Sequence, residues 1–377
     1  MKTTLIILFI IISVSLIFSQ STLLPLQASG TINLPFFIKS DIKQAMTSAY
    51  TDFLVRNFSR AESIYTEVYN QVNATVNYKI IGLALLGIGA SQGMQSKYND
   101  AINNLIASSK YQQEINNDTT LFQICFNLGL CQFAVLNYDD ALNSFKQSIS
   151  LHPISDQALI GLAETYTRKK EYDSALVNCD RALKLNPKSC DAYKAKGNVY
   201  IMQKEYDKAL TELAKAIQID STYYKAYVNR GLIYANQNEL QSAIREYGIA
   251  IKFNPRFSIA YNNLASAYDR LGDTTQAIAY YSQAIQVDPR FVLGYRNRAY
   301  DYYLTNKLDN AIQDYKKVVE LDSLDGLAMV RIGLAYNMKL DKGNATYWFG
   351  HALKHQERLS EWMIKMIEDE LKELGEK

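Results

Sequence analysis

The stretch FSIAYNNLASAYDRLGDTTQAIAYYSQAIQVDP, residues 257–289, alternates small residues with tyrosines and ends at a proline. Residues of the same kind recur when the chain is shifted by 34 positions. One column holds only alanine or glycine and comprises Ala163, Gly197, Gly231, Ala265, Ala299 and Gly333. A second column holds only tyrosine and comprises Tyr166, Tyr200, Tyr234, Tyr268, Tyr302 and Tyr336. This periodicity indicates an array of one repeated structural unit.

Each repeat predicts a hairpin of two helices. Apolar residues recur at intervals of three and four within residues 258–270 and 274–287, and the turn residues Leu271, Gly272 and Asp273 separate the two runs. Small residues let the helices approach closely, and aromatic residues fill the surrounding volume. We expect Pro289 to end the second helix, because proline cannot continue a helix interior. The expected small contacts are Ala265 and Ala277, surrounded by Tyr261, Tyr268 and Tyr281.

The repeat resembles the tetratricopeptide repeat (TPR), a helix–turn–helix unit of 34 residues. Its characteristic positions fall on Tyr261, Ala265, Tyr268, Ala277, Tyr281, Ala284 and Pro289. The resemblance implies an all-α, right-handed TPR solenoid of about nine helical hairpins over residues 41–355. The first two steps, from Ala49 to Gly89 and from Gly89 to Gly129, are 40 residues long. They predict a lengthened helix end or connection near residues 115–120.

Residues 356–377 predict a capping helix for the last hairpin. The expected apolar stripe comprises Leu359, Trp362, Met363, Met366, Ile367, Leu371 and Leu374. The alternative is a helix that lies on a membrane surface. From Glu361 to Lys377 acidic residues outnumber lysines by six to three, which is the wrong sign for anionic lipid.

The N-terminus predicts an export signal. Lys2 precedes an apolar run over residues 5–18, which is shorter than the roughly 18 to 20 residues that span a membrane. We therefore expect residues 1–20 to be a signal peptide, residues 21–40 to be a linker or lead-in, and the mature chain to be periplasmic or secreted without membrane insertion. The alternative is an uncleaved anchor formed by residues 5–18.

Composition argues against several classes of function. The chain of 377 residues has 40 Lys and Arg against 38 Asp and Glu, a balance that does not favour nucleic acid as a partner. It has three histidines and no phosphate-binding loop, zinc-protease motif or nucleophile elbow. We predict no catalytic residue, cofactor or metal, and expect His351 and His355 at the surface or in packing.

The four cysteines are predicted to be small buried apolar residues rather than disulfide partners. Cys125 and Cys131 lie six residues apart on one predicted helix, about 9 Å along its axis, which is too far for a disulfide. Cys179 and Cys190 are harder to exclude as a pair on spacing alone.

The TPR resemblance implies a non-catalytic scaffold that holds a protein or peptide on a concave face lined by the first helix of each repeat. Arginine beside tyrosine is favoured at binding hot spots, although Tyr300 and Tyr303 could instead pack between repeats. The residues predicted to line this groove are Lys194, Asn198, Lys225, Asn262, Asp269, Arg270, Arg296, Tyr300 and Tyr303.

Two alternative functions follow from other features. An uncleaved N-terminal anchor would make the chain a membrane-tethered envelope assembly factor. A co-chaperone-like role in binding acidic peptide tails would use a carboxylate clamp, for which Lys194, Asn198 and Asn229 stand at matching positions. Ile259 and Asn263 occupy places where that clamp requires Lys and Arg, so half of it is missing.

Overall fold

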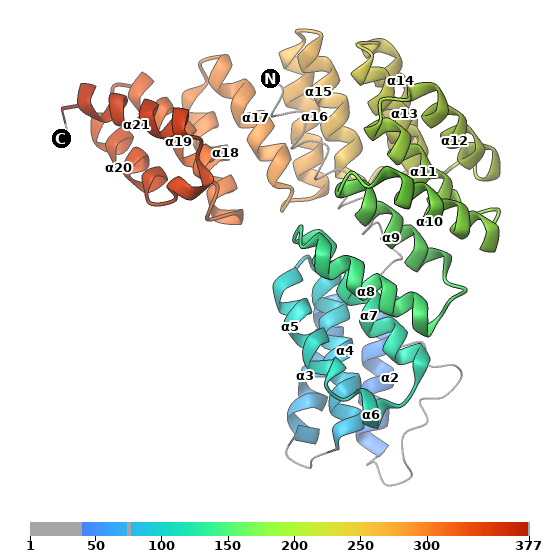
Figure 1. Cartoon of the computed structure of the whole chain (residues 1–377). Helices are drawn as coiled ribbons and strands as arrows, with labels where there is room; N and C mark the ends of the chain where they lie inside the picture. The colour runs from blue at the N-terminus through green and yellow to red at the C-terminus, as the bar shows by residue number, and fades with distance from the viewer. Residues whose placement is uncertain (1–39, 74–76, 376–377) are drawn as a thin grey trace. The chain divides into compact units, whose positions relative to one another are not determined.

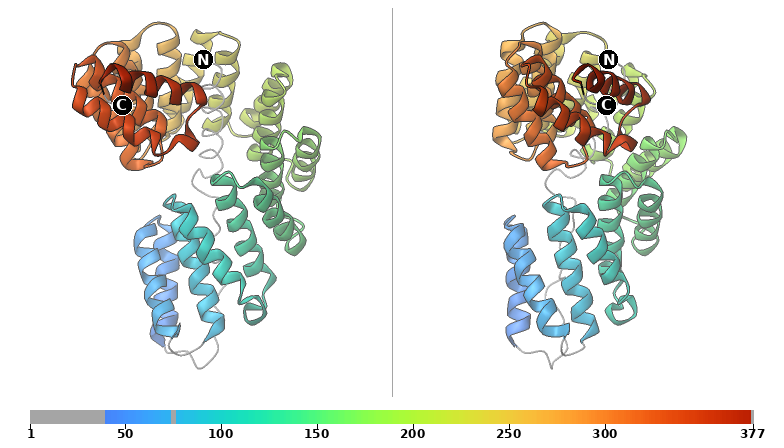
Figure 2. Two further views of the ribbon diagram at one scale, coloured as in Figure 1. Left: turned by 60° about the vertical axis from the view of Figure 1, so that its left-hand side comes forward. Right: turned by 90° about the vertical axis from the view of Figure 1, so that its left-hand side faces the viewer.

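The computed structural model of the chain describes residues 40–73 and 77–375, and all regular elements in these ranges are helices (Figure 1). The predicted signal peptide and nearly all of the predicted lead-in lie outside the described residues. The chain divides into two compact units, Met1–Ser221 and Thr222–Lys377. The described helices form nine hairpins of adjacent helices, as the repeat predicts (Figures 1 and 2).

The first unit contains five hairpins. They are α2 (Ser40–Leu54) with α3 (Phe58–Asn73), α4 (Tyr78–Met94) with α5 (Tyr98–Ser109), α7 (Asp118–Ala134) with α8 (Tyr138–Leu151), α9 (Asp156–Arg168) with α10 (Tyr172–Leu185), and α11 (Cys190–Met202) with α12 (Tyr206–Ile219). The short helix α6 (Gln112–Ile115) and the left-handed residue Asn116 lie where a lengthened connection is predicted. Helices α4 and α7 each have 17 residues, against 13 in α15, which accounts for part of the longer repeat step.

The second unit contains four hairpins and a terminal helix. They are α13 (Tyr224–Asn236) with α14 (Leu240–Phe253), α15 (Ser258–Arg270) with α16 (Thr274–Val287), α17 (Val292–Leu304) with α18 (Leu308–Leu321), and α19 (Gly326–Met338) with α20 (Lys342–Leu353), followed by the 3₁₀ turn η1 (Gln356–Arg358) and α21 (Glu361–Glu373). Helices α15 and α16 have the predicted bounds, and α16 ends just before Pro289.

The two helices of a hairpin meet at small residues. Ala265 of α15 and Ala277 of α16 are fully buried in one cluster with Tyr281, as predicted. At the same repeat position in α19, Gly333 lies so close to Phe349 of α20 that an added Cβ would come within 2.6 Å of the ring. Close helix packing therefore depends on the absence of a larger side chain at this position.

Every one of the nine hairpins turns through a residue with positive φ. The φ angles lie between 57° and 84°, and eight of the nine residues are not glycine: Arg56, Ser96, Leu136, Lys170, Lys204, Asn238, Asn306 and Leu340, with Gly272 as the ninth. The following backbone N–H donates to a carbonyl five residues earlier, as from Asp273 to Tyr268 at 3.0 Å. This is the Schellman arrangement, which satisfies carbonyl groups at the end of the first helix.

Helix α21 covers the last hairpin. Ile367 is fully buried against Phe349 and Ala352 of α20, and Leu371 and Leu374 pack on the same cluster. The prediction for Trp362 is wrong, because this side chain is 69% exposed. At 100° per residue, Trp362 lies about 140° around the helix from Ile367, on the side that faces away from α20.

All four cysteines are free. Cys131 and Cys179 are buried as predicted, whereas Cys125 and Cys190 are only partly buried. Burial raises the pKa of the Cys125 thiol to about 11 and that of Cys131 to about 12, so both resist ionisation. Within residues 40–73 and 77–375, no helix is long and apolar enough to cross a bilayer.

Candidate partner-binding site

In the second unit, helices α13, α15, α17 and α19 are the first helices of successive hairpins. Side chains connect them directly: Arg270 of α15 donates to the Ala235 carbonyl of α13 at 2.8 Å, and Asn297 of α17 donates to Asn262 of α15 at 3.0 Å. We call the solvent-facing side of these four helices the first-helix surface. Seven of the nine predicted groove residues belong to these helices, and the most exposed aromatic residue among them is on α17.

Tyr300, Tyr303 and Arg331 form a cluster on this surface, which we call the Tyr300 patch. The guanidinium carbon of Arg331 lies 5.1 Å from the ring centroid of Tyr300 and 5.7 Å from that of Tyr303. Tyr300 is 40% exposed, and Tyr303 and Arg331 are half-buried. Cation–π attraction between α19 and α17 thus holds three side chains together while one ring remains open to solvent.

Arg331 is absent from the predicted groove residues, although the sequence contains a signal for it. Within the second unit, the repeat column that it occupies reads Asn229, Asn263, Asn297 and then Arg331. A guanidinium therefore replaces an asparagine at one repeat only. Attention to single departures from a column would have found this residue.

Arg296 has a structural contact that its sequence position does not reveal. It forms an ion pair with Asp325, which caps α19 by accepting from the Ala328 N–H at 2.9 Å. Arg296 is partly buried, and its Nε atom has no hydrogen-bond partner. This residue therefore connects α17 to the start of α19 at the edge of the Tyr300 patch.

Three of the predicted groove residues are buried, which corrects the prediction for them. Lys194, 2% exposed, forms an ion pair with Glu164 at 2.6 Å in the first unit. Lys225 is 7% exposed, and Asn262 is fully buried and accepts from Asn297. Their side chains are occupied by the protein itself and offer no surface to a partner. Asn198, also in the first unit, is half-buried.

Asp269 of α15 and Asp301 of α17 form a carboxyl pair close to the Tyr300 patch. The two carboxyl groups are close enough for each to shift the pKa of the other, and a hydrogen bond between them requires that at least one is protonated. Burial, and then the neighbouring Asp269 carboxyl, raise the pKa of Asp301 to about 7. Burial also raises the pKa of Asp269. Arg270, the next residue of α15, is exposed.

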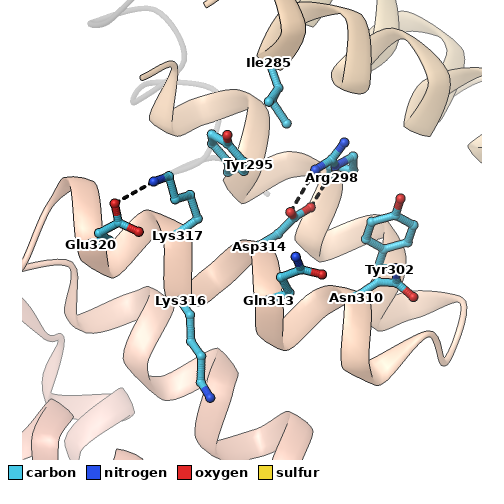
Figure 3. Close-up of a pocket in the computed structure, with 10 residues that line it drawn as sticks. All are labelled: Ile285, Tyr295, Arg298, Tyr302, Asn310, Gln313, Asp314, Lys316, Lys317 and Glu320. Carbon is cyan, nitrogen blue, oxygen red and sulfur yellow. Dashed lines mark hydrogen bonds and ion pairs between the residues drawn. The ribbon is translucent and has the colours of Figure 1, made fainter. Parts of the chain in front are cut away.

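A pocket of about 500 Å³ lies on another side of the second unit, between α16, α17 and α18 (Figure 3). Its charged residues are mostly paired with one another: Arg298 donates to both oxygens of Asp314 at 2.8 Å, and Lys317 contacts Glu320 at 2.5 Å. Charges already neutralised in pairs give a ligand little to gain. The Tyr300 patch is therefore the better candidate for contact with a partner.

No metal centre is evident among the described residues, where no group of three His, Cys, Asp or Glu side chains is placed to hold an ion. His351 packs against Tyr347 and Trp348, with ring centroids 4.9 and 6.1 Å apart. His355 lies 3.8 Å from Glu357, a contact that is an ion pair only when the histidine is protonated.

Comparison with known families identifies the repeat. Sequence profiles described as the tetratricopeptide repeat match residues 137–197, 224–257, 258–291 and 295–323, and one described as the TPR repeat matches residues 197–238. The chain is a tetratricopeptide repeat protein. The matched segments of this TPR protein contain the Tyr300 patch residues Tyr300 and Tyr303. A comparison with curated proteins found no match.

Several solved structures are similar to this TPR protein. A tetratricopeptide repeat protein from Parabacteroides merdae is 20% identical, with 67% of this chain and 97% of that one covered and a TM-score of 0.49. Pseudomonas aeruginosa pilF is 19% identical, with 57% of this chain and 97% of that one covered and a TM-score of 0.48. PilW, a type IV pilus biogenesis factor, is 20% identical, with 56% of this chain and 98% of that one covered and a TM-score of 0.48. Likeness at this level gives no argument about the partner of this chain.

Proposed function

We propose that this TPR protein is a non-catalytic scaffold that holds a protein or peptide partner on the first-helix surface of its second unit. TPR proteins are generally protein-interaction scaffolds, which supports a role in binding a protein or peptide. The observation that favours the first-helix surface as the binding site is the Tyr300 patch, where an exposed tyrosine lies beside an arginine that a second tyrosine also contacts.

The physical chemistry of the patch suits recognition. Tyrosine offers a large, rigid and amphipathic surface and loses little conformational entropy when a partner covers it. The Arg331 side chain is already ordered by two rings, so binding does not have to order it again. Leu304, which is 60% exposed on the same helix, adds apolar area beside these polar groups.

A two-step experiment tests the proposed site. A photo-crosslinking amino acid at position 304 should capture the partner in cells, and the same amino acid at position 340, in the exposed α19–α20 turn, serves as the control. After mass spectrometry identifies the partner, its affinity is measured with the purified chain. Tyr300→Ala or Arg331→Gln should weaken binding by at least about tenfold, equivalent to about 1.4 kcal/mol.

Tyr347→Ala is the matched control, because Tyr347 is a tyrosine of similar exposure on α20, at 57%. This variant should bind like the parent protein. If the Tyr300 and Arg331 variants also bind like the parent, the partner contacts another surface and the proposed site is wrong.

We further propose that the chain is exported, with residues 1–20 removed as a signal peptide. The support is the sequence alone, since these residues lie outside the described structure. The intact mass of the protein purified from its native cell tests the proposal. A chain that begins near residue 21 means cleavage, whereas a chain that begins at Met1 favours an anchor formed by residues 5–18.

A further inference from the structure

Asp301 occupies a repeat position that is otherwise small or apolar. Its column reads Thr165, Val199, Ile233, Ala267, Asp301 and Ala335, and all six side chains are buried. Thr165 is polar, but its hydroxyl has a hydrogen-bond partner, because it donates to the Gly161 carbonyl at 2.7 Å. Asp301 is 1% exposed, and its Oδ2 atom has no hydrogen-bond partner. A buried carboxyl in this state is costly unless it is neutral.

The groups that face Asp301 supply no compensating positive charge. The carboxyl of Asp269 on α15 is near enough to raise the pKa of Asp301, and the phenol of Tyr281 on α16 lies near both carboxyls. On α18, Asp314 is paired with Arg298, and Tyr315 lies near Arg331 and the tyrosines of the Tyr300 patch. Across residues 40–73 and 77–375, neither Asp269 nor Asp301 has an ion pair with lysine or arginine.

We propose that Asp269 and Asp301 form a proton-dependent joint between the hairpins α15–α16 and α17–α18. With one proton between them, the two carboxyls hold α15 and α17 together through a hydrogen bond. When both are ionised, the bond is lost, and two like charges repel each other where water is largely excluded. The joint lies beside the Tyr300 patch in the chain, but its existence does not depend on what the patch binds.

The direction of the pH effect follows from proton binding. Asp301 holds its proton more tightly in the folded chain than in the unfolded chain, where its pKa is the ordinary 3.8. The stabilisation is complete below the unfolded pKa and is lost as the pH rises through the folded value of about 7. Stability should therefore fall between weakly acidic and weakly alkaline pH, where most other carboxyls no longer titrate.

The test is the melting temperature of the full chain between about pH 5.5 and about pH 8.5, followed by circular dichroism. The parent should lose several degrees over this range. Asp301→Asn keeps the shape of the side chain but cannot ionise, so its curve should be flatter and should lie about 3 °C or more above the parent at the alkaline end. Asp269→Asn should flatten the curve in the same direction, because its amide can donate to Asp301.

Asp309→Asn is the control, since it removes one negative charge from an 83% exposed side chain of the same unit. Its curve should run parallel to that of the parent. Infrared spectra near neutral pH should also show a protonated carboxyl band that Asp301→Asn removes. The proposal is overturned if both joint variants keep the parent's pH dependence, if Asp309→Asn flattens it equally, or if the infrared band is absent.

Discussion

Helices α7 and α17 are both the first helices of their hairpins, yet they have opposite relations to solvent. In α7 nearly every residue from Phe122 to Phe133 is buried, whereas in α17 only Leu293, Gly294, Ala299 and Asp301 are. Leu130 and Tyr300 stand at the same repeat position, five steps of 34 apart, but Leu130 is 1% exposed and Tyr300 is 40% exposed. The repeat therefore determines the hairpin but not which surfaces of it become core.

The difference has a local cause. Helix α7 is packed by α4, α5, α6, α8 and α9, so it is apolar around most of its circumference. Helix α17 packs mainly against α16 and α18, and its side chains reach α15 and α19 through single polar and aromatic contacts. A first helix that is surrounded serves stability, and one that is partly open can present tyrosine and arginine to a partner.

The largest expected effect concerns a buried ion pair on the first helices α9 and α11. Lys194→Ala should destabilise the chain by about 3–5 kcal/mol, because it leaves the Glu164 carboxylate buried and unpaired. Urea unfolding measures the loss. The double variant Lys194→Met with Glu164→Leu should recover most of it. A Lys194→Ala chain as stable as the parent would mean that Lys194 lies at the surface, as the sequence pattern predicts.

The comparison of equivalent positions is tested directly by one pair of truncations. Leu130→Ala should cost about 2–5 kcal/mol, since it opens a cavity in a closed core. Tyr300→Ala should change stability by no more than about 0.5 kcal/mol. Similar losses for the two variants would show that Tyr300 packs between repeats, and the contrast between α7 and α17 would disappear.

Two glycines of the hairpin α19–α20 allow the same comparison, because Gly333 lies in the contact between the two helices and Gly350 does not. Gly333→Ala should cost about 1–3 kcal/mol, because the new methyl group would press on the buried ring of Phe349. Gly350→Ala on α20 meets no atom within 4 Å and should instead gain up to about 1 kcal/mol from helix propensity. Opposite signs in thermal unfolding are expected, and a loss at both sites would contradict the packing described for this hairpin.

The smallest effect is expected at a turn. Leu340 is 84% exposed and has φ of 61°, a conformation that glycine adopts without strain. Leu340→Gly should stabilise the chain by up to about 1 kcal/mol after the greater freedom of glycine in the unfolded chain is counted. The reverse test is Gly272→Ala, which should lower the melting temperature. A destabilising Leu340→Gly would indicate that the leucine side chain makes a contact that its exposure conceals.

Sequence periodicity predicted the hairpins well because the pattern that determines a hairpin is local. The bounds of α15 and α16 and the contact of Ala265 with Ala277 follow from spacing within one repeat. The candidate site was predicted less completely. Burial of Lys194 and Asn262 depends on Glu164 and Asn297, which belong to neighbouring repeats. The repeat position of a residue in the sequence therefore does not determine how far its side chain is buried.

Single departures from a column were more informative than the columns themselves. Arg331 after three asparagines and Asp301 among small and apolar residues are both visible in the sequence, and both have unusual surroundings in the structure. Trp362 is predicted wrongly for another reason. The spacing of apolar residues places it close to the helical stripe, but its side chain points to solvent.

The turn hydrogen bond from Asp273 to Tyr268, repeated in all nine hairpins, bears on the order in which the chain acquires its structure. A backbone bond across five residues closes after a very short chain search, on a timescale below about a microsecond. Most further contacts join helices that are adjacent in the sequence, so the relative contact order is low and folding is expected to be fast. During synthesis, each hairpin can therefore close as soon as its own residues are available, before those of the next hairpin have been added.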